Sequence, residues 1–104
     1  MAQDNLPLSQ AKNEAAAAFH FTLFKVSPDI LDDALGQVEA ALEPFDYKVH
    51  WGKWFVCRGA RIQQMHGEDL VKLRQLIQQH DPNGRFTNNY LQRCIMDMAS
   101  VAAD

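Results

Sequence analysis

Hydrophobic and polar positions alternate over residues 18–26, and this period of two predicts a β-strand. One face of the strand would carry Phe19, Phe21 and Leu23, and the other would carry His20, Thr22 and Phe24. Because both faces hold apolar side chains, we expect other elements to cover the strand on both sides. His20 and Thr22 would then share one face as its polar exceptions.

A second strand is predicted over residues 47–57, which are rich in aromatic and β-branched side chains. Gly52 interrupts this segment and indicates a β-bulge. In an unbroken strand, His50 and Lys53 would point to opposite faces. One extra residue at Gly52 would turn both side chains to the same side.

The most regular pattern in the chain predicts a helix that begins at Ser27-Pro28-Asp29 and stops at Pro44. Serine suits the capping position, proline the first turn, and aspartate the positive end of the helix dipole. Apolar residues then recur at spacings of three and four, at Leu31, Ala34, Leu35, Val38, Ala41 and Leu42. They form one stripe along the helix.

Two further helical segments follow. Residues 68–79 have an apolar face and two acidic residues in the first turn, and Asp81-Pro82-Asn83-Gly84 predicts a type I turn directly after them. Residues 90–98 predict a last, short helix. The resulting β-α-β-α order predicts an α+β fold.

Length and composition indicate one folded domain. Residues 1–15 predict a flexible lead-in and residues 16–104 the folded part, and 47% apolar residues exclude intrinsic disorder as the main state. Ten basic and 13 acidic side chains give a net charge of −3, which argues against nucleic acid as a partner. With neither a membrane-length apolar run nor a secretory signal, we expect a cytoplasmic protein. Cys57 and Cys94 are expected to be reduced and packed.

No glycine spacing matches a dinucleotide or phosphate loop, and the four histidines are too scattered to predict a metal site. The candidate site is therefore the set of polar residues inside the two predicted strands: His20, Thr22, His50 and Lys53. Two tryptophans flank Lys53 and would desolvate its ammonium group or support it by cation–π contact. The alternative is that the histidines are hydrogen-bonded core residues and that Lys53 extends to water from a strand edge.

Three motifs follow one another along the chain: Ala18-Phe19-His20-Phe21-Thr22, His50-Trp51-Gly52-Lys53 with Phe55, and Asp81-Pro82-Asn83-Gly84-Arg85-Phe86-Thr87-Asn88 followed by Tyr90-Leu91. Together they resemble the carboxy-terminal part of the aldonolactone and alditol oxidases, which are flavoenzymes of the vanillyl-alcohol-oxidase type. The resemblance covers about residues 16–94. It implies that residues 16–104 are a substrate-binding cap segment that lacks the FAD-binding domain. It also implies that the sheet of this segment is antiparallel, with the helices packed on one face.

The resemblance implies an FAD-dependent oxidation of a polyol or sugar lactone, with hydride passing to flavin N5 and oxygen or another acceptor reoxidising the flavin. Lys53 and His50 would be catalytic, Thr22, His20 and Lys53 would bind substrate hydroxyls, and Asn88 would lie near the cofactor. The implied partner is an FAD-binding domain or subunit, without which the chain would be inactive. A non-enzymatic, ferredoxin-like α+β module that self-associates through its sheet edge remains the alternative.

Overall fold

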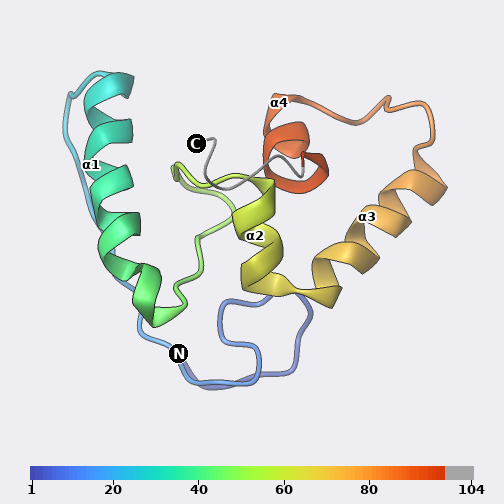
Figure 1. Ribbon diagram of the computed structural model, residues 1–104, viewed down its shortest axis with the longest axis horizontal. Coiled ribbons are helices and arrows are strands. Elements are labelled where there is room, and N and C mark those ends of the chain that lie inside the picture. Colours follow the sequence, from blue (N-terminus) through green and yellow to red (C-terminus); the bar gives the residue numbers. More distant parts are fainter. Residues whose placement is uncertain (98–104) are drawn as a thin grey trace. The chain divides into compact units, whose positions relative to one another are not determined.

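The computed structural model describes residues 1–97, and the chain divides into two compact units at residues 56 and 57. The first unit holds helix α1 (Pro28–Leu42) and a 3₁₀ turn (Glu43–Phe45). The second holds α2 (Gly59–His66), α3 (Glu68–His80), α4 (Asn89–Leu91) and a π-helical segment (Gln92–Met96) (Figure 1).

The first unit begins with a hydrogen-bonded loop. The amide of Asp4 donates to the carbonyl oxygen of Ala11 (3.0 Å), and the amide of Asn13 donates to the carbonyl oxygen of Asp4 (2.8 Å). Two longer-range bonds tie this loop to the segment after α1. The Gln10 amide group donates to the carbonyl oxygen of Val49 (3.1 Å), and the indole of Trp51 donates to that of Leu8 (3.2 Å).

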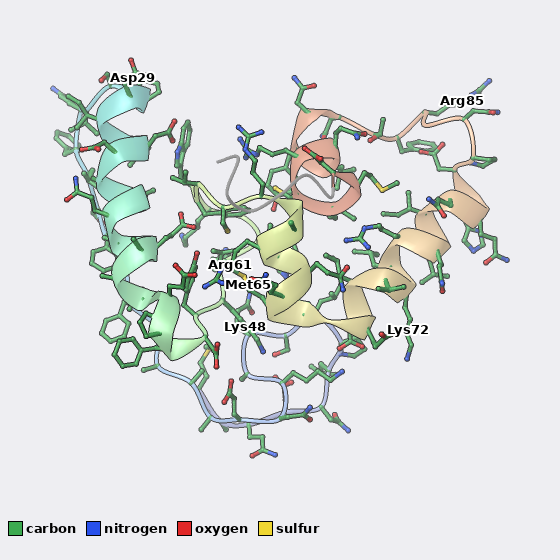
Figure 2. All side chains as sticks on the ribbon, viewed as in Figure 1. Asp29, Lys48, Arg61, Met65, Lys72 and Arg85 are labelled. Carbon is green, nitrogen blue, oxygen red and sulfur yellow. The ribbon has the colours of Figure 1, made fainter. Side chains whose placement is uncertain are left out.

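Helix α1 confirms the most regular sequence pattern. The Ser27 hydroxyl accepts from the amide of Ile30, Pro28 occupies the first helical position, and Asp29 lies at the start of the first turn (Figure 2). The helix ends before Pro44, as predicted. None of its residues is fully buried, so its apolar stripe is only half covered.

Carboxylates of α1 hold the returning segment, residues 46–56. Glu39 accepts from the hydroxyl of Tyr47 (3.0 Å) and from the amide of Val56 (2.6 Å). Asp32 accepts from the indole of Trp54 (2.7 Å). Side-chain bonds to a helix therefore fix this segment, in place of bonds to a neighbouring strand.

The second unit packs α2 against α3 and against the π-helical segment. Its buried residues are Cys57, Gly59, Ile62, His66, Leu70, Cys94 and Ile95. Gly67 joins α2 to α3 with a φ of +56° and a ψ of −129°, a conformation suited to glycine. Cys57 and Cys94 are both buried in this region and do not form a disulfide, as predicted.

The elements after residue 67 agree closely with the prediction from the sequence. Helix α3 spans the predicted residues and ends at His80, and the amide of Gly84 donates to the carbonyl oxygen of Asp81 (3.1 Å) to close the predicted turn. The last helix begins at Asn89, and Met98, its predicted end, lies outside the described residues. Helix α2 has no counterpart in the sequence prediction, because its eight residues are too few to show a clear period.

The predicted antiparallel sheet is wrong. Within residues 1–97 the only β-type pairing is an isolated bridge between Asp4 and Lys12, and residues 18–26 and 47–57 form no strand. A strand needs hydrogen bonds from a neighbour, and neither segment finds one in this part of the chain. Aromatic and β-branched residues favour strands where their side chains pack on a half-buried sheet surface. These two segments do not pack on such a surface within residues 1–97. Residues 1–97 therefore do not show the β-α-β-α order, the α+β class or the packing of helices on one sheet face.

Candidate functional site

His50 and Lys53 lie at the two ends of one tight turn. The amide of Lys53 donates to the carbonyl oxygen of His50 (3.1 Å), and the amide of Gly52 donates to Nδ1 of the His50 ring (3.0 Å). Gly52 therefore lies in a turn, and the predicted bulge is wrong because a bulge requires a paired strand. The turn nevertheless keeps the two residues close, since it brings its first and fourth residues together.

The turn presents two hydrogen-bond donors to solvent. Both His50 and Lys53 are exposed. With Nδ1 accepting from the backbone, the neutral His50 ring carries its proton on Nε2. That proton and the Lys53 ammonium group are both available to a ligand oxygen.

The flanking tryptophans fix the turn and do not enclose the lysine. The Trp51 indole is bonded to the N-terminal loop, and the Trp54 indole is bonded to α1. Both anchors belong to the first unit, so the turn has a defined place within that unit. The tryptophans thus act as supports for the turn, and the Lys53 side chain remains in water.

The other two predicted substrate residues, His20 and Thr22, are exposed side chains of the irregular segment before α1. In the described part of the chain, no hydrogen bond or ion pair joins either of them to His50 or Lys53. The structure therefore brings together two of the four candidate residues. No strand aligns the other two with them.

Asn88 has a structural role in the second unit. Its side-chain oxygen accepts from the amide of Leu91 (2.9 Å) and so caps helix α4. The side-chain NH₂ group of Asn88 makes no bond within residues 1–97 and stays available as a donor.

An apolar hollow of about 380 Å³ lies in the second unit, and the sequence did not indicate it. Its lining includes Leu76, Ile77 and His80 of α3, followed by Asp81, Phe86 and Leu91. The Asp81 carboxylate accepts from the amides of Arg85 (2.8 Å) and Phe86 (3.0 Å), which fixes the loop at one side of the hollow. None of the five predicted site residues lines it. The sequence signal for this hollow is His80, which ends an amphipathic helix directly before an Asp-Pro turn.

The hydroxyl of Tyr90, at the start of the last helical region, has a shifted pKa. Burial raises the pKa of its hydroxyl, the nearby Cys94 acts in the same direction, and Arg93 opposes them. Tyr90 is thus kept neutral and able to donate. Within residues 1–97, no three or more His, Cys, Asp and Glu side chains gather in a way that would hold a metal ion.

The model of the D-arabinono-1,4-lactone oxidase family matches residues 1–94. The chain belongs to the D-arabinono-1,4-lactone oxidase family. It is also 33% identical over 92 residues to an alditol oxidase of Streptomyces sp., an alignment that covers 88% of this chain and 22% of that enzyme. The chain thus spans about a fifth of the length of this relative. No solved structure matches it.

The described residues of this chain do not form a complete site for the FAD that the resemblance implies. The pyrophosphate of a dinucleotide needs converging N–H groups or basic side chains, whereas the hollow in the second unit is lined mainly by Leu, Ile, Phe and Met. The side-chain oxygen of Asn88, the predicted cofactor residue, is already used as a helix cap. These residues can contribute contacts to a flavin site but do not enclose one.

No helix within residues 1–97 is both long enough and apolar enough to cross a membrane.

Proposed function

We propose that this chain is the carboxy-terminal, substrate-binding portion of an FAD-linked oxidoreductase that acts on a sugar lactone or polyol. The observation that carries the proposal is the family match over residues 1–94, supported by the identity to an alditol oxidase. FAD would be bound by a separate domain or subunit, without which the chain is inactive. Residues 16–104 would form the cap segment in this arrangement.

The turn from His50 to Lys53 is the substrate-contacting element of this proposal. Oxidation of a CH–OH group removes a hydride from carbon and a proton from oxygen. When the proton is lost to solvent ahead of the hydride, negative charge develops on that oxygen. The Lys53 ammonium group and the Nε2–H of His50 would donate to it and stabilise this charge. Both groups belong to one turn that two indoles anchor, so they would approach the substrate together.

The remaining predicted residues would have supporting roles. Thr22 and His20 would bind further substrate hydroxyls once the segment that carries them is ordered against a partner. Asn88 would contact the cofactor through its NH₂ group while its oxygen caps α4. The hydroxyl and ring donors of this set match a substrate that carries several hydroxyl groups.

A hybrid enzyme tests the proposal. The 92 aligned residues of the Streptomyces alditol oxidase are replaced by the matching part of this chain, and anaerobic bleaching of the flavin is followed with a panel of polyols and sugar lactones. We expect bleaching by at least one of them. A folded, flavin-containing hybrid that no polyol or lactone bleaches would contradict the proposed function.

Lys53→Met in the hybrid enzyme should lower kcat/KM by about 100-fold or more, because a donor aimed at developing charge contributes on that order. The matched control is Lys72→Met, which removes an exposed lysine of α3 (Figure 2) and should leave the rate unchanged. The measurement is steady-state oxidation with the best substrate of the panel. An unchanged rate in Lys53→Met would remove Lys53 from the mechanism.

A further inference from the structure

The loop that follows α3 contains the one Asn-Gly pair of the sequence, Asn83-Gly84. Asparagine is a thermolabile residue, because its side-chain amide carbon can be attacked by the main-chain nitrogen of the next residue. A side chain on that next residue hinders the attack, and glycine has none. The other asparagines of the chain precede Leu6, Glu14, Asn89 and Tyr90. Asn83 therefore has the most accessible attacking group.

The structure leaves the side chain of Asn83 free to react. It is exposed, and within residues 1–97 it makes no hydrogen bond or ion pair. Asn88, in the same loop, differs because its side-chain oxygen accepts from the amide of Leu91 (2.9 Å). Asn83 can thus turn its amide carbon toward the nitrogen of Gly84, whereas helix capping holds Asn88 in place.

The attacking nitrogen itself belongs to a closed turn. The amide of Gly84 donates to the carbonyl oxygen of Asp81 (3.1 Å), and the φ of Gly84 is +67°. The Asp81 carboxylate also accepts from the amides of Arg85 (2.8 Å) and Phe86 (3.0 Å). Attack on Asn83 requires the Gly84 bond to open, and exposed loop bonds open at a low cost in free energy. The stability of the turn therefore sets how often the nitrogen can react.

We propose that Asn83 is a site of spontaneous deamidation and that the turn at Asp81 limits its rate. The Gly84 nitrogen forms a bond to the side-chain carbon of Asn83, and the bond from that carbon to the side-chain nitrogen breaks. Ammonia leaves with the proton that the Gly84 nitrogen loses. Water then opens the resulting succinimide ring to give aspartate or isoaspartate. The reaction transfers no electrons and requires no reactant other than water.

The product would loosen the loop beside the hollow of the second unit. A carboxylate replaces a neutral amide two residues from the carboxylate of Asp81, and like charges at short range repel. Isoaspartate also adds a methylene group to the main chain within the turn. Phe86 and Thr87 follow directly and line the hollow, so a looser turn would change its rim.

Peptide mapping tests the proposal without measuring activity, so its outcome is independent of the proposed function. The full chain is incubated at mildly alkaline pH, which favours the deprotonated attacking nitrogen, and is then digested with trypsin. One product is residues 75–85, whose one asparagine is Asn83, and another is residues 86–93, which contain Asn88 and Asn89. Mass spectrometry should show deamidation at least tenfold faster in the first peptide. Equal rates in the two peptides would overturn the proposal.

Asp81→Ala removes the carboxylate that holds the amides of Arg85 and Phe86, and it should speed deamidation of Asn83 several-fold. Asp33→Ala is the matched control, because it removes a carboxylate from α1 in the first unit and should leave the rate unchanged. Asn83→Gln should suppress the reaction, since the longer side chain would have to close a less favourable six-membered ring.

The same rate in wild type and Asp81→Ala would show that the turn does not limit the reaction. If Asp81→Ala does not fold, the wild-type chain is compared with and without urea, and equal rates there would be as decisive. Amide hydrogen exchange measures the effect on the loop. The amides of Arg85 and Phe86 should exchange at least tenfold faster after deamidation, and unchanged exchange would contradict the loosening.

Discussion

Asp4 organises the N-terminal loop through both oxygens of its carboxylate. One oxygen accepts from the hydroxyl of Ser9 (2.6 Å) and the other from the amide of Leu6 (3.0 Å). The Ser9 bond is the largest influence and lowers the pKa of the Asp4 carboxyl below 3.8, the bond from Leu6 adds to it, and Lys48 contributes further. The ionised side chain of Asp4 thus stabilises the N-terminal loop through bonds to nearby residues of the same loop.

A pH dependence of the loop follows from Asp4. Because the pKa of Asp4 is lower when the loop is formed, the ionised form stabilises the loop at pH values above 3.8, and this stabilisation is lost as the pH falls through the folded value. Ser9→Ala should raise the pKa of Asp4 toward 3.8, as followed by NMR titration of the carboxyl carbon. The control is Ser27→Ala, which removes a hydroxyl that caps α1 and should leave the pKa of Asp4 unchanged. The same Asp4 pKa in wild type and in Ser9→Ala would show that the Ser9 hydrogen bond does not lower it.

At the scale of elements, α1 organises the first unit with its carboxylates more than with its apolar stripe. None of its residues is fully buried, yet Glu39 and Asp32 bind three groups of the segment from Tyr47 to Val56. Hydrogen bonds to an ionised acceptor are stronger than those between neutral groups. The turn that carries His50 and Lys53 lies within this segment, so α1 positions the proposed substrate contacts indirectly.

Glu39→Ala should lower the free energy of unfolding of the first unit by about 2 kcal/mol, because two donors lose a charged acceptor. Urea unfolding followed by tryptophan fluorescence measures this, since both tryptophans lie in this unit. Asp33→Ala is the control on the same helix. It removes one exposed bond, from Gln37, and should cost no more than about 0.5 kcal/mol. Equal losses in the two variants would show that Glu39 does not hold the returning segment.

At the scale of the whole molecule, the chain consists of two units with different cores. The second unit buries Ile62, Leu70 and Cys94 completely, whereas the first leaves much of its aromatic surface in water. Surface that is exposed in the isolated chain is the surface that the proposed partner would cover.

One glycine in each unit offers a test of stability, Gly59 in the second unit and Gly36 in the first. Gly59→Ala would place a methyl group against the carbonyl oxygen of Asp97 and within 3.2 Å of that of Arg93, so we expect the second unit to lose about 1–3 kcal/mol. Gly36→Ala meets nothing within 4 Å in α1 and should stabilise that helix by about 0.5–1 kcal/mol. Thermal unfolding by circular dichroism measures both. A neutral Gly59→Ala would mean that α2 does not pack closely on the last segment.

The sequence predicted the features whose hydrogen bonds are local. Helix α1, helix α3 and the turn after Asp81 each close their bonds within a few residues, so capping side chains and apolar spacing were sufficient to place them. The family was also readable from three short motifs, and the match over residues 1–94 confirmed it.

Tertiary structure decided the features whose bonds depend on distant residues. Residues 18–26 and 47–57 have the composition of strands, but a strand requires a neighbour, and residues 1–97 provide none for either segment. The same dependence leaves His20 and Thr22 without a hydrogen bond or ion pair to His50 or Lys53 within residues 1–97, because only a sheet would have aligned them. A helix carries its own hydrogen-bond partners, whereas an extended segment takes its structure from whatever lies beside it.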